Sequence, residues 1–131
     1  DGLQVYMMCE IPNNVIQIGA FADLFDGFSI GSNDLTQLVL GVDRDSEVVA
    51  FDFDERDPGV LEMLRQAVKG AQFHDRPIGI CGEAPANYPE IAKFLTDLGV
   101  DSISVSPGSL AKTLKVVFEA ERSRPDDLSA A

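Results

Sequence analysis

The sequence predicts an α/β fold built on a parallel sheet, because short apolar segments alternate with longer amphipathic ones and the amphipathic segments carry helix-capping residues. The expected strands are residues 3–10, 28–31, 77–82 and 102–106, and the expected helices are residues 14–25, 58–72, 88–98 and 109–121. Four such units make half of an eight-unit barrel, which needs about 250 residues to close. A complete four-stranded flavodoxin-like sheet is the alternative, although no switch-point loop is clearly marked.

The expected elements have recognisable sequence signals. The first three strands contain the apolar runs 5–9, 28–30 and 78–81. Asp57 followed by Pro58 is typical of an N-cap and a first-turn proline, and Gly99 is placed to end the preceding helix. The last helix has an apolar stripe formed by Leu110, Leu114, Val117 and Phe118.

The composition is that of one globular domain, with 131 residues of which 45% are hydrophobic and 24% charged. We expect residues 1–122 to form the domain and residues 123–131, which lack a pattern, to form a disordered tail. The net charge of −12 repels phosphate backbones, so nucleic acid is not an expected partner.

No apolar run approaches the roughly twenty residues that cross a bilayer, so no membrane association is expected. The chain opens on Asp1 and Gly2, with neither a signal peptide nor an initiating Met. We therefore expect a cytoplasmic protein that was cut from something longer.

The segment from Leu35 to Arg56 is long and acidic, with six carboxylates between Asp43 and Glu55. Connections of this length are commonly functional loops or lids. A solvated charged excursion with a short helix inside is the simpler interpretation, and composition alone favours it.

Polar side chains follow the first two expected strands. Glu10 ends the first, and Asn33 and Asp34 follow the second. Carboxylates on neighbouring strand ends make a plausible Mg²⁺ platform, and an amide can bind a substrate carbonyl or carboxylate. A helix N-cap or a buried salt bridge would explain either carboxylate equally well, and a simple turn would explain the Ser-Asn-Asp run.

Two cysteines lie far apart without the spacing of a metal site. Cys81 stands between Gly79 and Gly82, which predicts space beside the sulfur for a small substrate, although an inert buried thiol is the commoner case. We assign that inert role to Cys9. His74, the only histidine, precedes the third strand and is expected to be exposed at the opposite end of the sheet.

Four motifs together resemble the phosphoenolpyruvate-binding barrel shared by phosphoenolpyruvate synthases, pyruvate phosphate dikinases and enzyme I of the sugar phosphotransferase system. They are the segments 8–12, 31–37, 42–46 and 79–83. The similarity extends to about Glu121. Within the family, Ser32 and the run 54–58 are most similar to the synthases. The resemblance implies the C-terminal half of a TIM-type (β/α)8 barrel.

The resemblance also implies roles for the residues at the strand ends. Glu10 and Asp34 would hold Mg²⁺, and Arg44 would contact the phosphoryl group of the substrate. Cys81 would exchange a proton at the methyl or methylene carbon. These roles suit the groups, since a guanidinium binds a phosphoryl group through paired hydrogen bonds and a positioned thiol can act as acid or base.

The resemblance assigns substrate binding to Asn33 and Ser32, with pyruvate or phosphoenolpyruvate as the ligand. The family's earlier barrel strands, its phosphohistidine domain and its ATP-grasp domain have no counterpart in the sequence. We therefore expect a fragment that alone neither consumes ATP nor makes phosphoenolpyruvate. Open sheet edges predict a homo-oligomer. The alternatives are a catalytically silent binding or assembly module, or the equivalent domain of enzyme I or of a dikinase.

Overall fold

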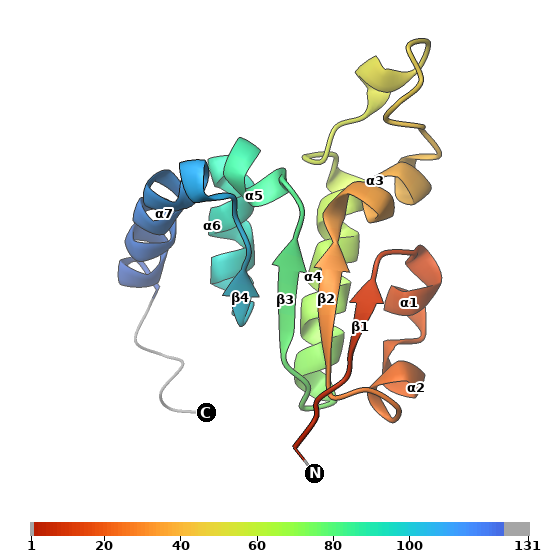
Figure 1. Cartoon of the computed structure of the whole chain (residues 1–131), viewed down its shortest axis with the longest axis vertical. Helices are drawn as coiled ribbons and strands as arrows, with labels where there is room; N and C mark the ends of the chain where they lie inside the picture. Colours follow the sequence, from red (N-terminus) through yellow and green to blue (C-terminus); the bar gives the residue numbers. More distant parts are fainter. Residues whose placement is uncertain (1, 125–131) are drawn as a thin grey trace.

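The computed structural model describes residues 2–124, which form a four-stranded parallel sheet flanked by helices (Figure 1). The strands lie side by side in chain order and are β1 (Tyr6–Cys9), β2 (Gly27–Gly31), β3 (Ile78–Cys81) and β4 (Ser102–Ile103). Each neighbouring pair is parallel. The predicted α/β architecture is therefore confirmed, and the carboxyl ends of all four strands meet along one edge, which we call the rim.

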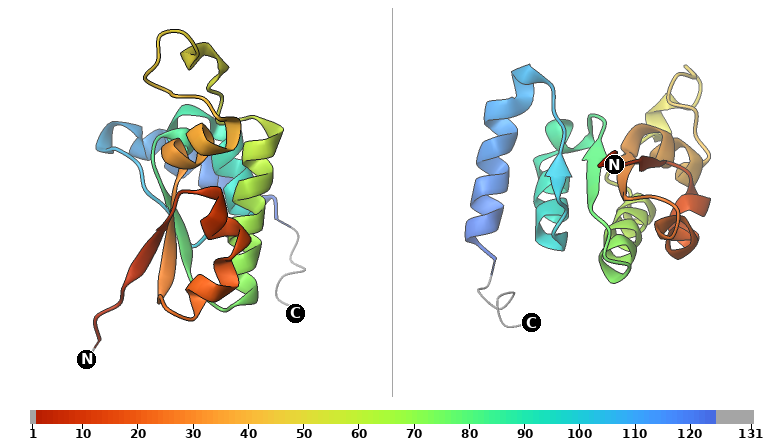
Figure 2. Two further views of the ribbon diagram at one scale, coloured as in Figure 1. Left: turned by 90° about the vertical axis from the view of Figure 1, so that its right-hand side faces the viewer. Right: turned by 60° about the horizontal axis from the view of Figure 1, so that its bottom comes forward.

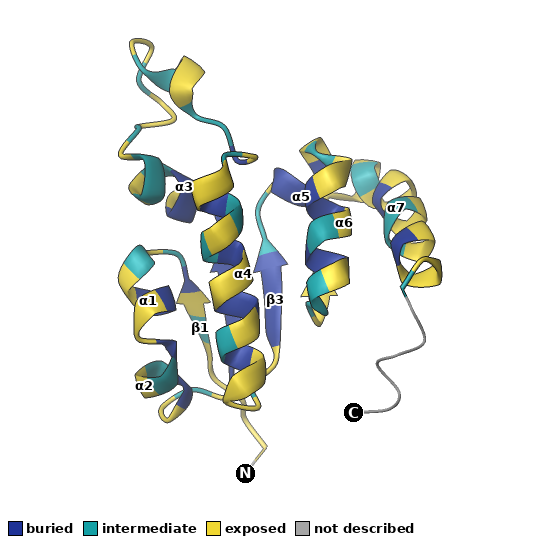
Figure 3. Ribbon diagram, turned by 180° about the vertical axis from the view of Figure 1, so that it is seen from behind, coloured by how far each residue is buried: buried dark blue, intermediate teal, exposed yellow. Residues whose placement is uncertain are grey.

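Helices cover one face of the sheet, as Figure 3 shows from behind, whereas the other face is uncovered in Figure 1. The helices are α1 (Pro12–Ile16), α2 (Ile18–Ala22), α3 (Ser32–Leu40), α4 (Pro58–Phe73), α5 (Ala84–Asn87), α6 (Pro89–Leu98) and α7 (Leu110–Arg122). Two short 3-10 turns are η1 (Ala50–Asp52) and η2 (Pro107–Ser109). The long helix α4 runs along the back of the sheet (Figure 2).

The hydrophobic core lies between the helices and the covered face, which we call the core face. Phe28, Ile30, Ile78 and Ile80 point to this face and are at most 1% exposed. Alternate residues of the strands point to the other side of the sheet, which we call the open face. Tyr6 of β1 lies on this face and is 46% exposed. The two faces thus differ in burial residue by residue.

The predicted helix caps are confirmed. The Asp57 side chain accepts a hydrogen bond from the Gly59 N–H at 2.8 Å, and Pro58 is the first residue of α4. Gly99 ends α6 in the left-handed conformation with φ of +88°. His74 ends α4 at the edge opposite the rim and is exposed, as predicted.

Helix α3 is the main departure from the sequence prediction, which left residues 35–56 as a connection. Its first turn is built from the Ser-Asn-Asp run that equally favours a turn, and no side chain caps it. Burial of Leu35 and Thr36 at 0% exposure fixes the segment as a helix. Beyond α3, the rest of the connection projects past the rim and contains the short helical turn η1 that the simpler interpretation expected (Figure 1).

Smaller differences occur as well, and the strand expected at residues 3–10 spans only Tyr6–Cys9. The helix expected at residues 14–25 is two short helices, because Gln17 leaves helical geometry with φ of −104° and ψ of 28°. The short helix α5 precedes the predicted helix at 88–98. The strand expected at 102–106 ends at Ile103, and Pro107, which lacks an N–H, begins η2 soon after. The tail expected at 123–131 lies outside the described residues, except for Ser123 and Arg124.

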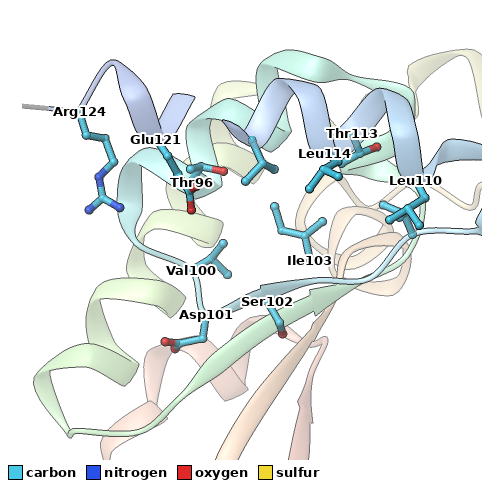
Figure 4. A pocket seen from close by; sticks show the side chains of 12 residues that line it. Thr96, Val100, Asp101, Ser102, Ile103, Leu110, Thr113, Leu114, Glu121 and Arg124 are labelled. Carbon is cyan, nitrogen blue, oxygen red and sulfur yellow. The ribbon is translucent and has the colours of Figure 1, made fainter. Parts of the chain in front are cut away.

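The apolar stripe predicted on the last helix is present but is not buried in the core. Leu110, Leu114 and Phe118 are 55%, 62% and 56% exposed. Leu110 and Leu114 line an open groove of about 220 Å³ between α7, α6 and β4, with Ile103 on its floor (Figure 4). Helix α7 packs mainly on α6, which leaves most of the stripe uncovered.

Within residues 2–124, no helix combines the length and the apolarity that a bilayer crossing requires.

Candidate functional site

The rim gathers the polar residues that the sequence analysis singled out. Glu10 follows β1, the segment 32–34 follows β2, and Cys81 is the last residue of β3. Gly31 pairs with Cys81 across β2 and β3, and Cys9 pairs with Ile30 across β1 and β2. Parallel pairing in this register brings all three strand ends together.

Glu10 and Asp34 form a pair of close carboxylates. Partial burial raises the pKa of Glu10 above its usual range, and the neighbouring Asp34, close enough to share a proton with it, raises this pKa further. Both side chains line an open pocket of about 470 Å³, together with Gln37, Leu38 and Asp43. A carboxylate whose charge is disfavoured by a second carboxylate beside it is suited to bind a cation.

The backbone geometry aims Glu10 into this pocket. The Asn14 Oδ1 accepts hydrogen bonds from the N–H groups of Glu10 and Ile11, each at 3.2 Å, which fixes the turn after β1. A Cβ at Gly31 would lie 2.8 Å from Glu10 Oε2, so only glycine leaves room for the carboxylate beside β2. Glu10 is neither the N-cap of α1 nor, within residues 2–124, part of a salt bridge.

Asn33 and Asp34 lie in the first turn of α3, with Asn33 half-buried and Asp34 exposed. Thr36 Oγ1 donates to the Ser32 carbonyl at 2.7 Å, which tightens this turn. The helix N-terminus provides N–H groups that favour negative charge nearby. Asn33 and Asp34 thus present an amide and a carboxylate at the rim from one rigid turn.

Cys81 lies on the open face beside Ser29. Ser29 Oγ donates to Cys81 Sγ at 3.5 Å, and the thiol lies 3.5 Å from the Ile30 carbonyl, to which it donates. The space that Gly79 was expected to leave beside the sulfur is filled instead, because a Cβ there would collide with Ser102 Oγ. That prediction was wrong, since β4 brings a side chain over Gly79.

Ser32 is buried at 2% exposure, and its hydroxyl donates to the Cys81 carbonyl at 3.3 Å. Gly82 follows with φ of +107°, and a Cβ there would collide with Ser32 Oγ. Ser32 therefore joins the ends of β2 and β3 and has a partner inside the protein.

Arg44 lies in the connection after α3. The Arg44 backbone N–H donates to Gln37 Oε1 at 2.8 Å, and Gln37 lines the same pocket as Glu10 and Asp34. Its guanidinium lies 3.8 Å from Asp45 Oδ1, and the Arg44 side chain is 44% exposed. The structure thus places Arg44 at the border of the pocket, with its guanidinium beside Asp45.

Comparison with known proteins gives the family. Residues 1–122 match the family described as PEP-utilising enzyme, PEP-binding domain. The chain belongs to this family.

Among curated relatives, the chain is 55% identical to phosphoenolpyruvate synthase of Synechocystis sp. over 94% of its own length. It is 52% identical to the synthase of Aquifex aeolicus and 46% identical to that of Escherichia coli, each over 93% of the chain. In each case it covers only 14% to 15% of the relative. The chain therefore corresponds to a fragment, and its four parallel strands agree with the C-terminal half of the PEP-binding barrel.

Two residues of this PEP-binding domain were not site candidates in the sequence analysis, although they lie near residues that were. Ser29 contacts Cys81, which lies 52 residues further along the sequence, so no local sequence pattern could predict this contact. Glu55, in the run that resembles the synthases, is only 5% exposed. Burial raises the pKa of Glu55, whereas the Arg44 guanidinium and the Ser32 hydroxyl lower it and Glu83 and Asp54 raise it.

The residues fit a magnesium ion, which the family resemblance implies. Mg²⁺ commonly takes one or two protein carboxylates and completes its shell with waters and substrate oxygens. Glu10 and Asp34 supply such a pair and face an open pocket. No cluster of three or more His, Cys, Asp or Glu suited to a metal occurs in the described part of the chain.

Proposed function

We propose that the chain carries part of the Mg²⁺-dependent pyruvate and phosphoenolpyruvate site of a phosphoenolpyruvate synthase. The parent enzyme would convert ATP, pyruvate and water to AMP, phosphoenolpyruvate and phosphate. The observation that carries the proposal is the pairing of Glu10 with Asp34 on the rim that also bears Cys81. The matched relatives with this printed name support it.

Each rim residue has a role in this proposal. Glu10 and Asp34 would hold the ion, and Mg²⁺ bound there would polarise substrate oxygens as a Lewis acid. The Asn33 amide would orient the substrate, with the α3 N-terminus favouring its negative charge. Arg44 would bind the phosphoryl group through paired N–H donors.

Cys81 would move the proton at the third carbon of the substrate. It would remove a proton from the methyl group when phosphoenolpyruvate forms, and return one to the methylene carbon in the reverse direction. Ser29 Oγ, 3.5 Å from the sulfur, would fix the thiol on the open face. Ser32 would act on substrate through its place in the first turn of α3, since its hydroxyl faces Cys81.

The proposal extends to the parent enzyme. ATP binding and the phosphohistidine step would belong to other domains of a longer protein, since the chain spans only about 15% of its relatives. We therefore expect the isolated chain to lack turnover. We further propose a cytoplasmic, gluconeogenic parent that associates as a homo-oligomer, because the edges of β1 and β4 have no neighbouring strand within the described residues.

A catalytically silent binding or assembly module is the alternative function, and the equivalent domain of enzyme I or of a dikinase is a third. The silent module differs from our proposal in having no metal pair that binds an ion. The domain of enzyme I or of a dikinase differs in the phosphoryl acceptor, which other domains outside this chain would select.

Titration with oxalate, a planar mimic of enolpyruvate, tests the proposal. Calorimetry should detect oxalate binding that requires Mg²⁺ and that Asp34→Ala abolishes. Asp23→Ala is the matched control, because Asp23 is exposed at the end of α2, away from the rim. Binding that is absent in the unmodified chain, or that survives Asp34→Ala, would contradict the proposal and favour the silent module.

A further inference from the structure

Gln37 lies in α3, three residues after Asp34 and seven residues before Arg44. It is half-buried and lines the pocket that Glu10 and Asp34 border. The Gln37 Oε1 atom accepts a hydrogen bond from the Arg44 backbone N–H at 2.8 Å, and Gln37 Nε2 donates to Asp34 Oδ1 at 3.4 Å. One side chain therefore contacts both the residue proposed to hold the ion and the residue proposed to bind the phosphoryl group.

The orientation of the Gln37 amide follows from the chemistry of its two partners. A backbone N–H can only donate, so the atom that faces Arg44 must be the amide oxygen. An ionised carboxylate can only accept, so the atom that faces Asp34 must be the amide nitrogen. Both partners demand the same orientation. A glutamate of similar length could only accept and a lysine could only donate, so glutamine is the long side chain that suits both neighbours.

The main chain of Gln37 holds the same segment. Helix α3 is followed by Gly41 in the left-handed conformation, with φ of +66°. The N–H groups of Gly41 and Val42 both donate to the Gln37 carbonyl, the second at 3.0 Å. Of the hydrogen bonds between Gln37 and this turn, only the one from the side chain reaches Arg44. Loss of the amide would therefore release Arg44 and leave the end of the helix intact.

Arg44 has little else to fix its position. Its guanidinium lies 3.8 Å from Asp45 Oδ1, and the two side chains are 44% and 84% exposed. Exposed pairs of this kind contribute little. Beyond Arg44 the connection projects past the rim (Figure 1). The hydrogen bond to Gln37 therefore determines where the Arg44 side chain begins, and it does so from the helix that also carries Asp34.

We propose that Gln37 is a positioning residue, whose amide holds the Asp34 carboxylate and the Arg44 backbone in a fixed relation to each other. The bond to Asp34 occupies one carboxylate oxygen and leaves the other for the ion, and donors of this kind orient the carboxylate ligands of metals. This inference rests on the proposed function, and it adds a residue that acts through Asp34 and Arg44. It predicts a larger loss for a ligand that uses both groups than for a ligand that uses the ion alone.

The first test needs no ligand. Gln37→Met removes both hydrogen bonds at nearly constant size. The exchange of the Arg44 backbone N–H with water, measured by NMR, should become about three- to tenfold faster, as expected for the loss of one hydrogen bond. Gln66→Met is the matched control, because Gln66 Nε2 donates to Glu62 Oε1 at 3.0 Å on the exposed surface of α4. An unchanged Arg44 rate in Gln37→Met, or an equal effect of Gln66→Met, would overturn the proposal.

The second test compares two ligands with Mg²⁺ present. Gln37→Met should weaken oxalate binding about threefold, through Asp34, and phosphoenolpyruvate binding about tenfold, through Asp34 and Arg44. In a chain that already carries Arg44→Met, Gln37→Met should weaken both ligands equally, because the effect through Arg44 is gone. Gln66→Met should weaken neither.

Two results of this comparison would overturn the positioning role. The first is full affinity for both ligands in Gln37→Met. The second is an extra loss for phosphoenolpyruvate that persists in the Arg44→Met background, because Gln37 would then contact the ligand itself. If the unmodified chain binds neither ligand, the proposed function fails, and the Arg44 exchange rate still decides whether Gln37 holds Arg44.

A third measurement, on the unmodified chain, covers the case in which Gln37→Met does not fold. Scalar coupling across the hydrogen bond should connect the Arg44 backbone ¹⁵N to the side-chain carbonyl ¹³C of Gln37. The bond from the Val42 N–H to the Gln37 backbone carbonyl, at 3.0 Å, is the internal reference. Coupling that is seen for Val42 and absent for Arg44 would overturn the proposal.

Discussion

The two cysteines end two different strands of the same sheet, yet their surroundings are opposite. Cys9 ends β1 on the core face, where it is 0% exposed, and burial raises its pKa to about 12, with a further contribution from Glu10. Cys81 ends β3 on the open face, beside Ser29. Cys9 pairs with Ile30 and Cys81 with Gly31, so a register difference of one residue separates an inert thiol from a candidate acid.

The same contrast holds for the whole sheet. The core face of β2 and β3 carries Phe28, Ile30, Ile78 and Ile80, all at most 1% exposed. The open face of these strands carries only glycine, serine and cysteine. The small residues of the open face accommodate side chains from neighbouring segments, such as Ser102 beside Gly79 and Glu10 beside Gly31, whereas the large residues of the core face hold the sheet on its helices. Stability and chemistry are therefore separated by the alternation of the strands.

Thiol reactivity should show the largest difference between the faces. A pKa of about 12 leaves Cys9 with about three orders of magnitude less thiolate than an ordinary cysteine near neutral pH, and burial blocks the reagent as well. With a thiol-directed reagent and mass mapping at pH 7.5, Cys81 should be labelled and Cys9 should not. Both should react in denaturant. Faster labelling of Cys9 in the native chain would contradict the assignment of faces.

Truncating a side chain on each face should show which face contributes more to the stability of the fold. Ile80→Ala should lower the free energy of unfolding by about 2 to 5 kcal/mol, because it leaves a cavity in the core. Ser29→Ala, on the opposite face of the neighbouring strand, should change it by less than about 1 kcal/mol. Urea denaturation measures both. Equal losses would mean that the open face is packed as tightly as the core.

A methyl group at Gly31 should damage the site more than the fold. The φ of −90° at Gly31 suits any residue, but the new Cβ would lie 2.8 Å from Glu10 Oε2 and displace that carboxylate. Gly31→Ala should therefore weaken Mg²⁺-dependent oxalate binding by about tenfold or more. Gly108→Ala, whose Cβ meets nothing within 4 Å, is the control. Undiminished affinity in Gly31→Ala would argue against Glu10 as a ligand.

The smallest expected effect concerns pH. Burial and Asp34 raise the pKa of Glu10, so the folded chain binds more protons than the unfolded one between the ordinary and the raised value. This contribution makes stability fall as pH rises through that window. In chelator-treated samples, Glu10→Gln should be more stable than the unmodified chain above the window, with the difference vanishing below it. A pH-independent difference would contradict the carboxylate pair.

The sequence predicted the strands and several caps because those signals are local. Asp57 with Pro58, and Gly99, mark helix ends by chemistry that acts within a few residues. Helix α3 was missed because its Ser-Asn-Asp start is equally good turn chemistry, and burial of Leu35 decided between them. Glu10 lies on the same face as Met8, as the alternation of side chains along a strand requires, since both side chains approach Gly31.

Features that depend on distant segments could not be predicted. The contact between Ser29 and Cys81, and the filling of the space at Gly79 by Ser102, both arise from register between strands. The burial of Glu55 depends on how the acidic connection folds back over the rim. In the sequence, Glu55 looks like one carboxylate among several in a charged run.

Paramagnetic broadening by Mn²⁺, used in place of Mg²⁺, tests the central claim most directly. In ¹H–¹⁵N spectra at substoichiometric Mn²⁺, the amide signals of Glu10, Gly31 and Asp34 should broaden first, and those at the amino ends of the strands should be affected last. The account predicts one bound ion at the rim. Broadening that begins in the exposed acidic segment from Asp43 to Asp52, with Glu10 and Asp34 unaffected, would contradict it.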